Sequence, residues 1–172
     1  MILSNVDIMR AVASGRIKFT PALKADQFGS GSVDLTLSNE FWRFKPEAKG
    51  QILELDAIDL DKIMEHVLAS EITILPGELI HGKTVERITL PSNLCGHLEG
   101  RSRYARRGLA IHVTSAFVQP GSDNHQVLEI TNLAPYAIKL RAGTRCTQVI
   151  LEEVHTSTSK PYKSFGKIAK RQ

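Results

Sequence analysis

Short strand-like segments separated by turn residues fill the second half of the chain, and this pattern constrains the fold most strongly. From Glu71 onward the apolar runs are interrupted by Pro76-Gly77, by QPGSDN and by APY. The runs cover residues 71–91, 109–118, 125–133 and 137–154. Short strands at regular spacing, with Pro and Gly in the turns, are typical of β-sandwiches and β-barrels. The sequence therefore predicts a mainly β domain with a few short helices.

The first 70 residues mix helix and strand signals. Ser4 followed by Asp7 resembles a helix N-cap with an acidic first turn, and the helical spacing after it ends at Gly15. Residues 32–44 alternate between apolar and polar side chains and are rich in strand formers. The spacing of residues 60–69 predicts a second helix.

Length and composition indicate one soluble domain. The 172 residues are enough for one domain with a proper core, and no apolar run approaches the ~20 residues that span a bilayer. The first ten residues lack the pattern of a signal peptide. Cys95 and Cys146 do not make a disulfide framework, which is typical of a cytoplasmic protein. From these features together we expect a cytoplasmic protein that does not bind membranes.

The positive charge is concentrated in two places. Four arginines lie within residues 101–107, and the last thirteen residues hold five basic side chains and no acidic one. Basic clusters suit a polyanion such as a nucleic acid or a triphosphate, although solubility alone also explains a basic tail. Aromatic content is only 6%, which argues against a stacking surface for nucleic acid. The segment after about residue 155 has little apolar content, and we expect it to be mobile until a ligand orders it.

The arginine-rich segment is a candidate phosphate site. If it forms a turn or two of helix, Ser102 and Arg106 share one face, and Arg103 and Arg107 share a neighbouring face. Gly100 would let the backbone approach a ligand closely. A solvated basic surface explains the same pattern, and the residues alone leave both interpretations open.

Glu129 is a candidate general acid–base. On a strand it would share a face with Val127 and Thr131, opposite Leu128 and Ile130. A carboxylate in such surroundings is either a half-exposed strand residue or a placed acid–base group, whose pKa burial would raise and an arginine would lower.

The sequence carries no complete metal-site or nucleotide-loop motif. His97 and Glu99 match half of a zinc-deaminase signature, but the P-C-x-x-C half is absent. We expect no zinc, and we expect His112 and His125 to be strand residues with local hydrogen bonds rather than ligands. The Walker A, G-x-G-x-x-G and G-x-S-x-G patterns are also absent.

Taken together, several segments resemble the dCTP deaminase branch of the dUTPase-like superfamily. They are residues 1–19, 29–44, 76–91, 100–121, 125–132 and 140–151, and they keep the order and spacing of the family. The resemblance implies a distorted β-barrel of the jelly-roll or β-clip kind over residues 1–155, with residues 156–172 as a flexible basic lid on the nucleotide. It also implies a homotrimer with active sites between subunits.

The activity implied by this resemblance is metal-independent, hydrolytic deamination of dCTP to dUTP and ammonia, which supplies dUTP and dUMP for thymidylate synthesis. In this family Mg²⁺ accompanies the triphosphate, and dTTP is a common inhibitor. Some members also cleave dUTP to dUMP and pyrophosphate.

The resemblance also assigns roles to individual residues. Glu129 matches the catalytic glutamate, with Arg106 and Ser102 beside it. The residues expected to bind the substrate are Arg101, Arg103, Thr114, Ser115, Gln119, Gln148, Tyr162 and Lys167. Arg107 is expected at the surface or in a subunit contact.

Three positions depart from the family pattern. Arg103 replaces a serine, Gln119 replaces the aspartate that receives the sugar, and Ser122 replaces an aromatic residue. Glutamine accepts a hydrogen bond but is no base at neutral pH, which counts against pyrophosphatase activity. The alternatives are therefore a dUTPase or a bifunctional enzyme, a nucleotide-binding homologue without catalysis, and a deaminase of a modified cytosine nucleotide.

Overall fold

A computed structural model of the chain describes residues 1–112 and 114–165, and its secondary structure is mostly strand. The strands are β1 (Lys18–Thr20), β2 (Val33–Leu35), β3 (Leu37–Phe44), β4 (Met64–Leu68), β5 (Glu71–Ile74), β6 (Leu79–Thr89), β7 (Leu94–Gly100), β8 (Leu109–Ile111), β9 (Phe117–Val118), β10 (Asp123–Asn132), β11 (Ile138–Arg141) and β12 (Thr147–Glu153). The α-helices are α1 (Asn5–Ala13), α2 (Leu60–Ile63), α3 (Ser102–Ala105) and α4 (Tyr162–Phe165). Short 3₁₀ turns cover Ala25–Gln27, Pro46–Ala48 and Leu55–Ala57.

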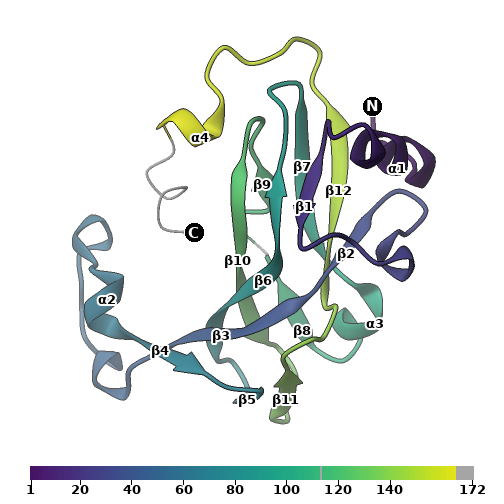
Figure 1. The fold of residues 1–172 in the computed structure, drawn as a ribbon. Coiled ribbons are helices and arrows are strands. Elements are labelled where there is room, and N and C mark those ends of the chain that lie inside the picture. Colours follow the sequence, from purple (N-terminus) through teal and green to yellow (C-terminus); the bar gives the residue numbers. More distant parts are fainter. Residues whose placement is uncertain (113, 166–172) are drawn as a thin grey trace.

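The strands form three sheets. The largest has the order β4-β3-β6-β10-β8, with β1 also paired to β6, and its long strands β6 and β10 run through the centre of the molecule (Figure 1). A second sheet has the order β2-β12-β7-β9, and β5 pairs with β11 in a third. The predicted mainly β class with a few short helices is confirmed, although the sheets remain separate and do not close into one continuous barrel.

The core lies between the two larger sheets. Phe41, Leu128 and Ile130 from the first sheet and Val149 and Leu151 from the second are all inaccessible to solvent. Along β10, buried and half-buried residues alternate without a break. The predicted alternation around Glu129 is therefore confirmed, and Glu129 lies on the face of the sheet turned away from the core.

The N-terminal helix forms as its capping signal predicts. The Ser4 side chain accepts from the Asp7 backbone N–H, and the Asp7 carboxylate accepts from the Ser4 N–H at 3.1 Å, which makes a capping box. Ile8 and Ala11 face the core. Gly15, at φ 74°, ends the segment in a conformation that glycine adopts readily.

The predicted helix over residues 60–69 is wrong beyond its first turn. The helix α2 ends at Ile63, and Met64–Leu68 continues as β4. The strand pairs antiparallel with β3, for example Trp42 with His66. On β4 only Met64 is buried, so a helix here would bury little of the apolar face that its spacing suggests. Backbone pairing with β3 therefore decides the conformation of this segment.

The apolar run 109–118 is also interrupted. The strand β8 ends at Ile111, and the next residue, His112, has a φ of 58°. This left-handed conformation cannot continue a strand, so the chain turns away before β9. In the described part of the chain, no helix has the length and apolar character needed to cross a membrane.

Candidate active site

The centre of the candidate site is a contact between Glu129 and His112. His112 Nδ1 lies 2.5 Å from Glu129 Oε2, and the His112 backbone N–H donates to the Glu129 carbonyl at 2.9 Å. The His112 side chain is only 5% exposed, whereas that of Glu129 is 31% exposed. The left-handed backbone of His112 turns its ring back onto the carboxylate. The carboxylate is thus anchored through one oxygen, and the Glu129 side chain stays partly exposed.

The surroundings of Glu129 favour its ionised form. Burial acts to raise the pKa of this carboxyl, but the hydrogen bond from His112 and the charge of that imidazole outweigh it. The pKa therefore lies below its usual value, and Glu129 is a carboxylate at neutral pH. An ionised, partly exposed carboxylate with one anchored oxygen can take a proton from water or from a ligand.

A second group of predicted residues gathers where β2, β7 and β12 meet. Arg101 Nη1 lies 2.8 Å from the Asp34 carboxylate and donates to the Arg145 carbonyl at 3.0 Å. Gln148 pairs in register with Asp34, and its side chain accepts from Ser32 Oγ at 2.7 Å. Burial raises the pKa of Asp34, and the Arg101 charge opposes this rise. Arg101 and Gln148 are thus close together.

The short helix α3 carries the other candidates from the arginine-rich segment. It begins at Ser102, directly after Arg101, and the Arg106 backbone N–H donates to the Ser102 carbonyl. The predicted helical turn is confirmed, and it leaves Ser102 and Arg106 exposed. Within the described residues, neither side chain makes a hydrogen bond or ion pair. The Arg103 guanidinium lies 5.2 Å from the centre of the Tyr104 ring.

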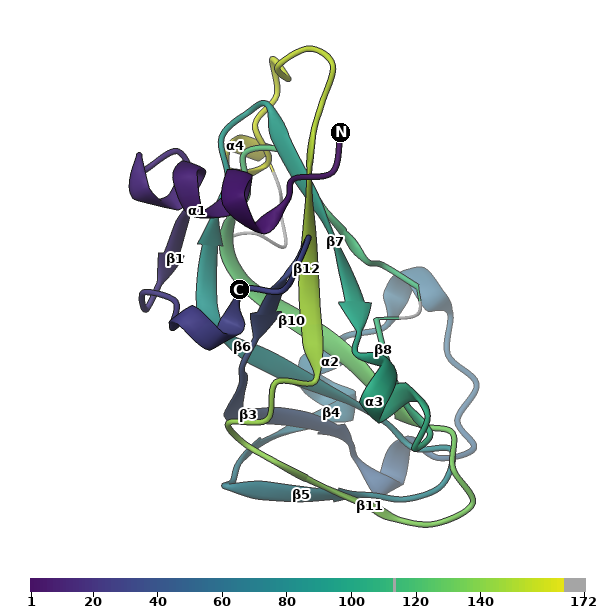
Figure 2. The ribbon, with the colours of Figure 1, turned by 90° about the vertical axis from the view of Figure 1, so that its right-hand side faces the viewer.

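Within the described residues, the side chains of α3 make no hydrogen bond or ion pair with Glu129. The strand β8, which follows α3, runs beside β10, so that Leu133 N–H donates to Gly108 and His112 N–H donates to Glu129 four residues further along. Four residues of strand span about 13 Å. Figure 2 shows α3 beside the start of β8. Gly108, which follows α3, is therefore about 13 Å along the strand from the pairing of His112 with Glu129. The side chains of Ser102 and Arg106 make no hydrogen bond or ion pair with Glu129 in the described part of the chain.

The remaining substrate-binding candidates lie beyond His112. Thr114 and Ser115 are exposed in the loop that precedes β9. Gln119 is also exposed, and its carbonyl accepts from Ser122 Oγ at 2.6 Å and from the Ser122 N–H at 3.1 Å. The Ser122 hydroxyl thus closes this hairpin turn from inside, since Ser122 is only 2% exposed.

The C-terminal segment rests on the same hairpin. After β12 the chain crosses the top of the molecule to α4 (Figure 1). There Tyr162 N–H donates to the Pro120 carbonyl at 3.0 Å, and Lys163 N–H donates to the Gly121 carbonyl at 3.2 Å. The Tyr162 ring meets the ring of Phe165 edge-on. Lys167 lies outside the described residues, and the division of the chain near residue 155 remains a prediction.

Replacing Gly121 should release this segment. Gly121 has a φ of 75°, and an added Cβ would lie 2.6 Å from Pro161 Cβ. We expect Gly121→Ala to increase the rate of tryptic cleavage after Lys163 about tenfold. Gly77→Ala is the matched control, because Gly77 has a φ of 76° with nothing within 4 Å of its added Cβ. Equal cleavage rates in the two variants would show that the contact with Pro161 does not hold the segment.

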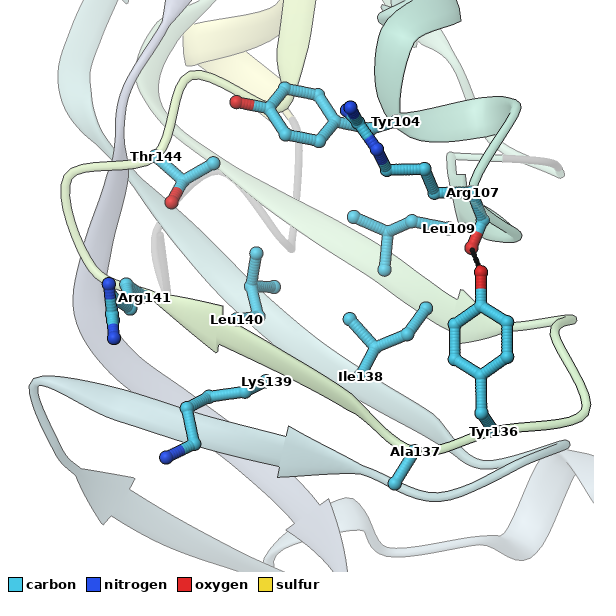
Figure 3. Close-up of a pocket in the computed structure, with 10 residues that line it drawn as sticks. All are labelled: Tyr104, Arg107, Leu109, Tyr136, Ala137, Ile138, Lys139, Leu140, Arg141 and Thr144. Carbon is cyan, nitrogen blue, oxygen red and sulfur yellow. Dashed lines mark hydrogen bonds between the residues drawn. The ribbon is translucent and has the colours of Figure 1, made fainter.

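A pocket of about 540 Å³ lies between the α3 region and β11 (Figure 3). It is lined by Tyr104 and Arg107 from the α3 region and by Leu140 and Arg141 of β11. The Tyr136 hydroxyl closes one end by donating to the Arg107 carbonyl at 3.1 Å (Figure 3). The exposed Arg107 thus lines a pocket that contains none of the residues predicted to bind the substrate.

Sequence reasoning missed the contact between His112 and Glu129. The prediction that His112 is a strand residue with a local hydrogen bond was wrong: His112 follows the end of β8, and its partner Glu129 is distant in sequence, because β8 and β10 are neighbours in the sheet. Among residues 1–112 and 114–165, no three His, Cys, Asp or Glu side chains lie close enough together to hold a metal ion. The expectation of no zinc stays a prediction.

Comparison with known proteins identifies the family. A family model described as dCTP deaminase-like matches residues 2–154. A dCTP deaminase from Rhodospirillum rubrum is 36% identical over 173 residues, covering 94% of this chain and 87% of that protein. A dUMP-forming dCTP deaminase from Methanosphaera stadtmanae is 34% identical over 164 residues, covering 94% of this chain and 83% of that protein.

A solved structure supports the fold. The 2′-deoxycytidine 5′-triphosphate deaminase from Agrobacterium tumefaciens superimposes with a TM-score of 0.69 at 20% identity. The match covers 90% of this chain and 48% of that longer chain, so this chain spans about half of it. Since the family model spans residues 2–154 and the relatives align along nearly the whole chain, the protein belongs to the dCTP deaminase-like family.

Proposed function

We propose that the protein deaminates dCTP hydrolytically, releasing dUTP and ammonia, and so supplies dUTP and dUMP for thymidylate synthesis in the cytoplasm. The observation that carries this proposal is the ionised Glu129, held at 2.5 Å by His112 and still partly exposed to solvent. Membership of the dCTP deaminase-like family supports the choice of substrate. The reaction needs one group that moves protons, and Glu129 suits that role.

In this mechanism Glu129 takes one proton from water while the water oxygen bonds to C4 of cytosine. The carboxylic acid then returns that proton to N3, which leaves a tetrahedral carbon bearing a hydroxyl and an amine. Glu129 next takes the hydroxyl proton and delivers it to the amine, the C4–N bond breaks, and ammonia leaves as the C4 carbonyl forms. The lowered pKa keeps Glu129 ready as a base at the start of each cycle.

The triphosphate is assigned to the cluster around Arg101. Its Nη1 is occupied by Asp34 and the Arg145 carbonyl, whereas Nε and Nη2 make no hydrogen bond in the described part of the chain. These two donors match the fork with which arginine binds phosphate oxygens. Gln148 pairs in register with Asp34, and the exposed Arg103 follows Arg101 by two residues. In this proposal Mg²⁺ arrives bound to the triphosphate of the substrate.

The active site is proposed to form between subunits of a homotrimer. The side chains of Ser102 and Arg106 make no hydrogen bond or ion pair with Glu129 or any other residue in the described part of the chain. A neighbouring subunit would bring its α3 to this Glu129, where the arginine would hold the carboxylate ionised and the serine would help to place water. Thr114 and Ser115, exposed beside His112, would meet the base, and Gln119 would meet the sugar. Tyr162 and Lys167 belong to the lid over the nucleotide, and dTTP is the expected inhibitor.

A second candidate is a bifunctional enzyme that also forms dUMP. The Methanosphaera stadtmanae relative carries the name dCTP deaminase, dUMP-forming. Against this, Gln119 cannot act as a base for pyrophosphate cleavage. Arg103, Gln119 and Ser122 depart from the family pattern, and these departures leave three further hypotheses. The protein would then be a dUTPase, a binding protein without catalysis, or a deaminase of a modified cytosine nucleotide.

One assay separates these functions. Purified protein is given dCTP, CTP, dCMP, dUTP and a 5-substituted dCTP in separate reactions, and ammonia and pyrophosphate are measured. We expect ammonia from dCTP with no pyrophosphate from dUTP. Pyrophosphate released from dUTP would favour the bifunctional enzyme or a dUTPase. Ammonia released only from the 5-substituted dCTP would identify a modified cytosine nucleotide as the substrate. Binding without any release would indicate a regulatory protein.

A further inference from the structure

A row of polar and aromatic side chains crosses the sheet at the level of Glu129. Glu129 on β10 pairs in register with His81 on β6, which pairs with Trp42 on β3, and Trp42 pairs with His66 on β4. Cross-strand partners in an antiparallel sheet share one face, with their Cβ atoms about 5 Å apart. His81 is therefore next to Glu129, on the side opposite His112.

The His81 ring is held in place but has no hydrogen-bond partner. It is half-buried, and it meets the Phe44 ring edge-on with centroids 6.3 Å apart. Its nitrogens make no hydrogen bond anywhere in the described residues. Burial lowers the pKa of His81, and the Glu129 charge offsets this only in part. At neutral pH the ring is uncharged, so one nitrogen can accept a hydrogen bond.

Glu129 has one oxygen available on this side. Oε2 is in contact with His112 Nδ1, whereas Oε1 is hydrogen-bonded to no side chain in the described part of the protein. The two imidazoles therefore differ in role. His112 is almost fully buried and anchors the carboxylate, while His81 is more accessible and lies on the neighbouring strand in register with Glu129.

We infer that His81 positions the attacking water by accepting one of its hydrogen bonds, while Glu129 takes the other proton. Two acceptors on adjacent strands fix both O–H bonds of a single water molecule, which leaves a lone pair of its oxygen directed away from the sheet. This inference rests on the proposed deamination and assigns His81 a positioning role in it. Orientation of this kind raises the rate of the chemical step without adding affinity for the nucleotide.

The test compares two substitutions at His81 with one at His66. His81→Leu keeps a side chain of similar bulk but removes the hydrogen-bond acceptor. His81→Gln restores an acceptor. We expect His81→Leu to lower kcat for ammonia release from dCTP about 10- to 100-fold with KM within about twofold. His81→Gln should recover a large part of that loss. His66→Leu, in the same row but beyond Trp42, should leave both constants unchanged.

Each outcome has a definite meaning. Full activity of His81→Leu alongside an active wild-type protein overturns the inference and leaves the deamination intact. Equal losses in His81→Leu and His81→Gln, or a rise in KM alone, also overturn it, because a structural or binding role would then explain the effect. If the wild-type protein releases no ammonia from dCTP, the proposed function fails and the inference fails with it. Thermal denaturation of each variant identifies a loss caused by unfolding.

Discussion

Glu129→Gln is expected to lower kcat for ammonia release from dCTP by at least about 10³-fold, because the amide cannot take a proton from water. The variant keeps the length of the side chain and an oxygen that can accept from His112 Nδ1. Binding of dCTP should therefore persist, and calorimetry of the variant should give a Kd within a few-fold of the wild-type value.

Glu152→Gln is the matched control for this experiment. Glu152 lies 3.6 Å from a histidine, His97, on the other large sheet, and its side chain is 34% exposed against 31% for Glu129. We expect the kcat of the Glu152→Gln variant to equal that of the wild-type protein. Substantial deamination by Glu129→Gln would show that another group moves the protons and would remove the basis of the proposed mechanism.

Arg106→Ala is expected to lower kcat by about 10²-fold or more, and this loss should be reversible by a second defective chain. If each site takes Glu129 from one subunit and Arg106 from its neighbour, co-expression of Arg106→Ala with Glu129→Gln produces mixed trimers. With random assembly, one site in each mixed trimer, or about a quarter of all sites, then carries both intact residues. Ammonia release by the mixture should greatly exceed that of either variant alone.

The control pair is Glu129→Gln with Glu129→Ala, which cannot complement because both chains lack the same group. Recovery in the first pair but not in the second establishes a shared site. No recovery in a mixture that sediments as trimers would place Arg106 and Glu129 in sites that do not meet between subunits.

The sequence was informative where a local pattern determines the structure. Alternation correctly placed Glu129 on the half-exposed face of β10, and the capping signal at Ser4 and Asp7 correctly placed α1. The segment 60–69 failed because its conformation is decided by pairing with β3, which a local pattern cannot show.

The candidate site was predictable only in part, for the same reason. The helical turn at Ser102 formed as expected, while the roles that the motifs suggest for Glu129 and Ser102 stay predictions. The neighbours of Glu129 could not be identified, because His81 on β6 and His112, just after β8, come next to it only through the order of the strands in the sheet, which no short stretch of sequence shows. His112 also has a left-handed backbone that its residue type does not suggest.

The contact of Glu129 with His112 links the proton affinity of the proposed base to the stability of the fold. The pKa of Glu129 is lower in the folded protein than the value of about 4.3 for a free glutamate, so ionisation of this group favours folding. That contribution is complete above the unfolded-state pKa and is lost as the pH falls through the folded-state value. Acid therefore removes the base and weakens the native state by adding the same proton. Active-site carboxylates are often kept at the expense of stability, but here selection for an ionised base and selection for a stable domain act in the same direction.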